Sequence, residues 1–164
     1  MTLDPSKHAG LPPGDAKFLK SIEEFGWHVM SVAPRAGDEG NLWAYSTGLF
    51  YSHDHPEVIV FNLDLDSLPN VVNSIGTRVK AGEKFKVGKS YTGIFNDREC
   101  QFRWVDKSQY KEYIGFSLWF YEGWDFPVLQ AFWPDEDNRY PWTDGGDGWI
   151  RQTQPLLYEE LPSA

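Results

Sequence analysis

The residue types best suited to chemistry lie close together in the segment SHDHPE, residues 52–57. His53 and His55 are separated by one residue, so an extended segment points both imidazoles the same way, and Glu57 continues that row. Two imidazoles and a carboxylate in a row suit Zn²⁺ or Fe²⁺. No histidine follows His55 in the chain to complete such a site. We therefore expect His55, Pro56 and Glu57 to begin a buried strand, with no bound metal and no other cofactor.

Nucleophilic catalysis is not indicated by the other candidates. Ser46 does not lie in a Gly-x-Ser-x-Gly elbow, and Cys100 has no neighbouring histidine that would lower the pKa of its thiol. His28 alternates with Met30 and Val32, which is typical of a histidine with a structural place in a core. The sequence therefore predicts no catalytic residue.

A second group of polar residues surrounds the end of an apolar run in residues 127–142, which read PVLQAFWPDEDNRYPW. The run is bounded by prolines and predicts a buried strand. Gln130 interrupts it, and we expect this amide to bond to backbone or to another polar core group, because an unsatisfied buried amide costs about 1–3 kcal/mol. The turn that follows places three carboxylates between two tryptophans, with Arg139 as the nearest cation and with Asp144 and Asp147 close behind. The predicted binding residues are Trp133, Asp135, Glu136, Asp137, Arg139 and Trp142.

The composition favours a single acidic domain. The chain has 164 residues, of which 41% are hydrophobic and 24% charged, as in one globular domain. The net charge of −9 and the lack of a Lys/Arg cluster argue against nucleic-acid binding and favour a basic partner or solubility. A lone cysteine, Cys100, excludes an internal disulfide and is consistent with a reducing compartment. No apolar leader or membrane-length window occurs, which predicts a soluble, cytoplasmic protein without a membrane partner.

The local patterns predict an α+β fold. We expect a flexible leader over residues 1–14 and one domain over residues 15–164, in which residues 149–161 dock as a closing arm. The order of elements favours a mainly antiparallel or mixed sheet with two or three helices packed on one side. Neither GxGxxG nor GxxxxGK(S/T) occurs, which excludes a doubly wound nucleotide-binding fold. Helices are predicted over 15–25, 67–81 and from Asp106 or Ser108 to about Trp119, and strands over 27–32, 42–50, 58–61, 100–105 and 128–133.

Several segments together resemble a known bacterial family. These are FGWHVMSV, WAYSTGL, HPEVIVF, VLQAFWPDEDNRYPW and QPLL, which fall in the family's order between Phe25 and Leu157. They resemble the family of domains of unknown function numbered 4262. The resemblance implies a compact α+β protein of the bacterial cytoplasm, sometimes encoded near secretion or toxin loci, and it supplies no catalytic residue. Asn138 stands where the family usually has glycine, and Tyr45-Ser46-Thr47 replaces the more usual Tyr-Thr-Val.

Two functions of different classes are compatible with these patterns. The first is a non-catalytic binding protein, in the manner of an immunity protein that neutralises a toxin, whose acidic and aromatic surface meets a basic partner. The alternative is a small enzyme or ligand-binding domain with a pocket around His55, Glu57 and Gln130. The lack of a complete catalytic constellation favours the binding protein.

Overall fold

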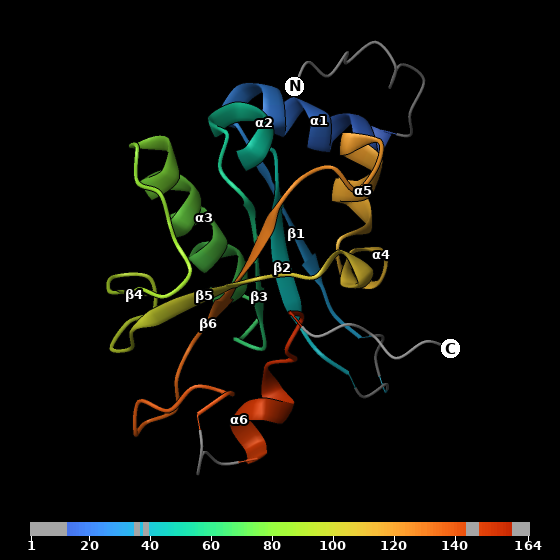
Figure 1. Ribbon diagram of the computed structural model, residues 1–164. Coiled ribbons are helices and arrows are strands. Elements are labelled where there is room, and N and C mark those ends of the chain that lie inside the picture. Colours follow the sequence, from blue (N-terminus) through green and yellow to red (C-terminus); the bar gives the residue numbers. More distant parts are fainter. Residues whose placement is uncertain (1–12, 35–36, 38–39, 144–147, 159–164) are drawn as a thin grey trace.

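The structure is a computed structural model that describes residues 13–34, 37, 40–143 and 148–158. A mixed six-stranded sheet with the strand order β1-β2-β3-β6-β5-β4 forms its centre (Figure 1). Neighbouring strands are antiparallel except β3 and β6, which are parallel, so the predicted α+β class with a mixed sheet is confirmed. The strands are β1 His28–Val32, β2 Trp43–Thr47, β3 Glu57–Phe61, β4 Ser90–Tyr91, β5 Cys100–Trp104 and β6 Val128–Phe132.

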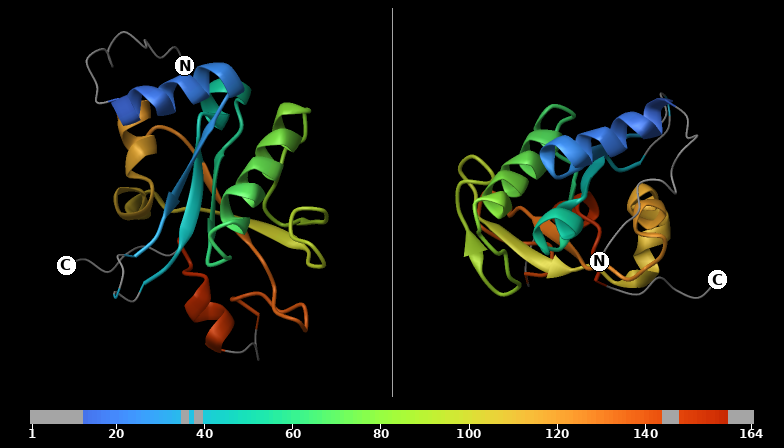
Figure 2. Two further views of the ribbon diagram at one scale, coloured as in Figure 1. Left: turned by 180° about the vertical axis from the view of Figure 1, so that it is seen from behind. Right: turned by 90° about the horizontal axis from the view of Figure 1, so that it is seen from above.

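Helices cover both faces of the sheet, which differs from the predicted one-sided packing (Figures 1 and 2). α3 packs on one face, whereas α1, α4 and α5 pack on the other. The physical reason lies in the two central strands, since every residue of β3 and β6 is buried and both of their faces need cover. The helices are α1 Pro13–Phe25, α2 Leu49–His53, α3 Ser67–Lys80, α4 Tyr110–Tyr113, α5 Gly115–Tyr121 and α6 Gly148–Thr153, with a 3₁₀ turn at Lys107–Gln109.

α3 is the helix that the sequence predicts best. Its apolar stripe is buried against β1, β2 and β3. Ser67 is the first residue of the helix, and the Asp64 carboxylate accepts from the Ser67 N–H at 2.8 Å and from its hydroxyl at 2.7 Å. Gly82 follows the helix with φ 104, as suits the residue that ends it. The buried residues of α3 are Leu68, Val71, Val72, Ile75, Gly76 and Val79.

The strand predicted over residues 42–50 ends early, at Thr47. Gly48 has φ 121, and Leu49 begins the short helix α2. A Cβ at residue 48 would lie 2.6 Å from the carbonyl oxygen of Gly26, so the turn into β1 and the turn into α2 touch at backbone level. The strand prediction is wrong here because alternation of apolar residues does not report this close approach.

The helix predicted from Asp106 is present but broken. The Asp106 carboxylate accepts from the Ser108 N–H at 2.9 Å, as predicted for an N-cap. Ile114 has φ −132 and ψ 47, which separates α4 from α5. No helix among the described residues combines the length and the apolar character needed to span a bilayer.

Candidate functional site

The row of His53, His55 and Glu57 does not form. His53 is the last residue of α2, and Asp54 follows in the left-handed region with φ 53, so the expected extended segment is interrupted. His53 packs edge-on against Trp27, with ring centroids 6.3 Å apart, whereas His55 and Glu57 turn to other neighbours. In the described part of the chain, no group of three or more His, Cys, Asp or Glu side chains is placed to hold a metal ion.

His55 is a buried structural histidine, 3% exposed. Its Nδ1 lies 2.8 Å from the Pro56 carbonyl oxygen, and its Nε2 accepts from the Phe85 N–H at 3.1 Å. Nδ1 must therefore carry the proton, and both ring nitrogens are used in the neutral form. Burial lowers the pKa of His55, which agrees with that assignment.

Glu57 begins β3, as predicted, and its carboxylate is 1% exposed. It stabilises the start of α2, because backbone N–H groups of that helix donate to it, and it joins α5 to the sheet through Tyr121. Burial raises the pKa of Glu57, and the hydrogen bonds it accepts oppose that change. Its donors are the Ser46 hydroxyl at 2.8 Å, the N–H groups of Gly48 at 2.9 Å, Leu49 at 3.1 Å and Phe50 at 3.3 Å, and the Tyr121 hydroxyl.

Gln130 is buried and bonded to backbone, which confirms the prediction from its place in an apolar run. Its Nε2 donates to the Pro155 carbonyl at 2.7 Å, and its Oε1 accepts from the Leu157 N–H at 3.2 Å. Both partners belong to the segment after α6, so the expected closing arm docks on β6. His55, Glu57 and Gln130 each serve a different internal contact, and none of them lines the hollows described below.

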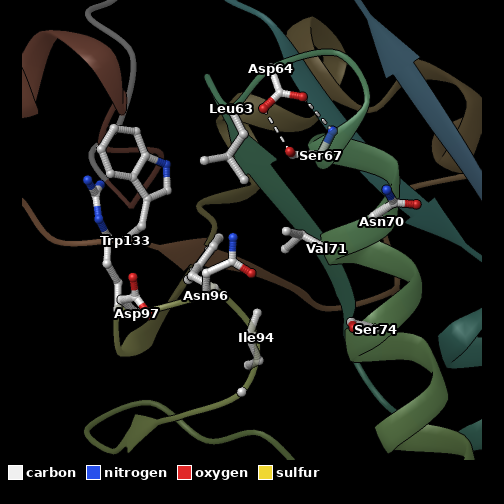
Figure 3. A pocket seen from close by; sticks show the side chains of 13 residues that line it. Leu63, Asp64, Ser67, Asn70, Val71, Ser74, Ile94, Asn96, Asp97 and Trp133 are labelled. Atoms are coloured by element: carbon white, nitrogen blue, oxygen red, sulfur yellow. Dashed lines mark hydrogen bonds between the residues drawn. The ribbon is translucent and has the colours of Figure 1, made fainter.

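A hollow of about 640 Å³ lies between α3 and the segment that joins β4 to β5. We call it the α3 groove. Figure 3 shows Trp133 on one side of it and α3, with Asn70, Val71 and Ser74, on the other. Asn96 and Asp97 lie on the wall opposite α3. The groove is thus assembled from three segments that are far apart in the sequence.

Two arginines fasten the wall formed by residues 93–98. At its start, Arg78 of α3 donates to the Thr92 carbonyl at 2.7 Å while forming an ion pair with Glu83. At its end, Arg98 donates to the Pro134 carbonyl at 3.2 Å and lies 5.6 Å from the centroid of the Trp133 ring. A cation over an aromatic face is attracted by the ring quadrupole. The groove is therefore held open by contacts within the protein.

Four of the polar side chains that line the groove are not used internally. Within the described ranges, the side chains of Asn70, Ser74, Asn96 and Asp97 make no hydrogen bond or ion pair. They are exposed to solvent at the mouth of the groove. Two carboxamides, a hydroxyl and a carboxylate are thus available to a ligand.

The predicted acidic turn borders a second hollow of about 540 Å³, which shares Asp97 and Arg98 with the α3 groove and is also lined by Glu136. Asp135 organises this turn, since its carboxylate accepts from the N–H groups of Asp137 and Arg139, both at 2.9 Å. The Arg139 N–H is the main cause of a lowered pKa of Asp135. Arg139 also pairs with both carboxylates, so its single positive charge offsets about half of the negative charge of Asp135 and Asp137 within the turn.

The two predicted tryptophans differ in position. Trp133 is 3% exposed, lines the α3 groove, and donates from Nε1 to the Phe61 carbonyl at 3.0 Å. Trp142 lies away from both hollows, stacked on Tyr140 and beneath Arg103, whose guanidinium is 4.2 Å from its ring centroid. Asp144 and Asp147 lie outside the described residues.

The structure brings only part of the predicted set together. Trp133, Asp135 and Glu136 line the hollows, whereas Asp137, Arg139 and Trp142 do not. Sequence reasoning missed the opposite walls, although the run NDRE at residues 96–99, between two predicted apolar segments, could have indicated the loop. The missed residues are Asn70, Ser74, Asn96, Asp97, Arg98 and Glu99.

The fold and groove define a compact α+β protein with a preformed, polar surface hollow. The family model described as "Domain of unknown function (DUF4262)" matches residues 21–147, and the chain belongs to this family. The matched residues include both walls of the α3 groove and the acidic turn, and they end before α6. No curated protein and no solved structure matches the chain.

Proposed function

We propose that this protein is a non-catalytic binding protein that receives a basic polypeptide partner along the α3 groove and the acidic turn. Its role would be that of an immunity protein that neutralises a toxin domain in a bacterial cytoplasm. One observation carries the proposal: the groove is held open by Arg78 and Arg98, while four polar side chains of its lining make no hydrogen bond or ion pair among the described residues, namely those of Asn70, Ser74, Asn96 and Asp97.

The charge around the hollows supports a basic partner. Five carboxylates line the two hollows, and Arg98 is the cation that lines both. Arg98 is already placed over Trp133, and Arg139 neutralises one carboxylate of the five. The protein as a whole carries a net charge of −9, so its field attracts a cationic partner over a long range at low salt. The five carboxylates are Asp64, Asp97, Glu99, Asp135 and Glu136.

The chemistry of the buried polar residues supports binding over catalysis. His55 uses both ring nitrogens, and Glu57 accepts five hydrogen bonds without access to solvent. A general acid or base must reach the proton of a bound substrate. The alternative of an enzyme with a pocket around His55, Glu57 and Gln130 has no supporting observation.

The test uses the product of a neighbouring toxin-like reading frame as the probe, with association measured by biolayer interferometry at several salt concentrations. The double variant Asp97→Lys with Glu136→Lys should slow association about tenfold or more at low salt and leave dissociation nearly unchanged. A matched double variant, Glu23→Lys with Glu112→Lys, changes the net charge equally on exposed helical positions remote from the groove. The proposal fails if the two double variants slow association to the same extent, or if the wild type does not bind a basic partner at all.

A further inference from the structure

The sheet ends at β1 in an open edge. Among the described residues, the backbone of 28–32 makes no hydrogen bond beyond the ladder with β2. Its sequence, HVMSV, contains no proline, lysine, arginine or carboxylate, the residues that commonly protect edge strands from pairing. The other edge strand, β4, has only two residues. β1 is therefore the edge at which another strand can add.

A hollow of about 550 Å³ adjoins this edge, between the end of α1, the start of β1 and one side of α3. Figure 2 shows α1 and α3 on different sides of β1. Phe25 lines the hollow and is 63% exposed, more than any other large apolar residue described. Phe25 lies beside the half-buried Trp27 and Val29 in the lining of the hollow, and contiguous exposed apolar surface of this kind marks interaction sites.

The floor of the hollow is rigid. The Trp27 indole donates from Nε1 to the Asn73 side-chain oxygen at 3.0 Å. Its ring lies so close to α3 that a Cβ at Gly76 would be 2.6 Å from it. The hollow is consequently formed before any partner binds, which spares the cost of ordering it.

We propose that β1 receives an extended segment of a partner polypeptide as an added strand, with one bulky apolar side chain of that segment in the hollow beside Phe25, Trp27 and Val29. Main-chain hydrogen bonds to an edge strand give affinity. Every second side chain of the added strand can enter a pocket beside the edge, which gives specificity. This surface differs from the α3 groove and lies along a different side of α3.

The charged side chains beside β1 indicate which charges the added segment carries. Lys17 of α1 and Lys80 of α3 are exposed, and neither forms an ion pair within the part of the chain that the structure describes. Lys80 lines the hollow, and Lys17 is close enough to act electrostatically on His28. Unpaired cations beside the edge of a chain with net charge −9 favour carboxylates on the added segment.

A second copy of this chain paired in the register centred on Met30 would leave the hollow largely unfilled. An antiparallel, twofold-symmetric pairing of two β1 strands centred on Met30 places Ser31 of the copy opposite Val29 and Ala33 opposite Trp27. Directly opposed residues project to the same face, so only a hydroxymethyl and a methyl group would enter the hollow. A hollow of about 550 Å³ calls for a larger side chain.

The test selects linear peptides from a phage-displayed random library on the immobilised full-length protein. The enriched peptides should combine carboxylates with a bulky apolar residue and bind as synthetic peptides. Phe25→Ser, at an exposed position, and Ser31→Pro should each weaken binding about tenfold or more, with folding checked by circular dichroism. Lys80→Glu should weaken it too, whereas the matched change Lys111→Glu on α4 should not. Only every second N–H of an added strand faces β1. Methylating the backbone nitrogens of that set of alternate residues should therefore abolish binding, whereas methylating the intervening residues should leave it intact.

Several results would overturn the inference. The library could yield no enriched peptide, or peptides that bind Phe25→Ser as tightly as the wild type. Equal binding by peptides methylated on either of the two alternate sets of residues would exclude strand addition. Sedimentation analysis that shows a dimer of the wild type, lost in Ser31→Pro, would assign the edge to a second copy and contradict the proposed occupant.

Discussion

Gln154 holds the backbone of Trp133 through two hydrogen bonds: its Oε1 accepts from the Trp133 N–H at 3.0 Å, and its Nε2 donates to the Trp133 carbonyl at 2.7 Å. Gln154 is fully buried and belongs to the closing arm after α6. Trp133 follows β6 and forms one wall of the α3 groove. The arm therefore supports the groove, although it lies beyond the residues that match the family.

Gln154→Ala should lower the free energy of unfolding by about 2–3 kcal/mol, because a buried N–H and a buried carbonyl of Trp133 both lose their partner. Urea denaturation measures the change. Gln152→Ala is the matched control, since Gln152 is exposed on α6 and its loss should cost less than about 0.5 kcal/mol. Equal midpoints for the two variants would show that the two hydrogen bonds from Gln154 to Trp133 do not stabilise the protein.

Two glycines with similar backbone angles should respond differently to alanine. Gly48 has φ 121 and a Cβ there would lie 2.6 Å from the Gly26 carbonyl oxygen, whereas Gly82 has φ 104 and no atom within 4 Å. Gly82→Ala should cost about 1 kcal/mol through backbone strain alone. Gly48→Ala should cost at least about 2 kcal/mol more, because the backbone must also move apart. Thermal unfolding of both variants measures the difference, and similar losses would contradict the close approach.

The contribution of His55 to the stability of the protein should fall as the solution is acidified through the ordinary pKa of histidine, whereas the raised pKa of Glu57 acts with the opposite sign. Burial lowers the folded-state pKa of His55, so the unfolded state binds more protons below about pH 6.5. The stabilisation is complete above that pH and is lost as the pH falls towards the lowered folded-state value, by about 1.4 kcal/mol for each unit of lowering. His55→Gln should flatten this dependence in urea denaturation between about pH 5 and 7. The variant should keep part of the pH dependence, because burial also lowers the pKa of His28. An unchanged slope in the variant would show that His55 does not titrate differently on folding.

Removing Arg98 should loosen one wall of the α3 groove. Arg98→Ala loses the hydrogen bond to the Pro134 carbonyl and the contact with the Trp133 ring, so the amides of residues 93–98 should exchange with deuterium several-fold faster. Lys86→Ala is the control, because Lys86 is exposed near β4 and does not line the groove. Global stability should change by less than about 1 kcal/mol, since Arg98 is exposed. Exchange that is unaltered in Arg98→Ala would mean that other contacts hold this wall.

The sequence by itself determined the elements whose cause is local. Helix α3 follows from an apolar stripe between a polar start and Gly82, and β3 and β6 follow from short apolar runs. The burial of Gln130 was predictable for the same reason, because the residues on either side of it are apolar. The identity of its partners in the closing arm was not, since they lie 25 and 27 residues further along the chain.

Only the tertiary structure decided where the site lies. Periodicity shows which side of an element is buried, but it does not show which other element covers that side or how close two backbones come. The α3 groove depends on such long-range placement, since Ser74, Asn96 and Trp133 meet there from separate segments. The same holds for His55 and Glu57, which the sequence placed in one row. The fold turns them to different neighbours, Phe85 and Tyr121, while α2 and the left-handed Asp54 separate His53 from both.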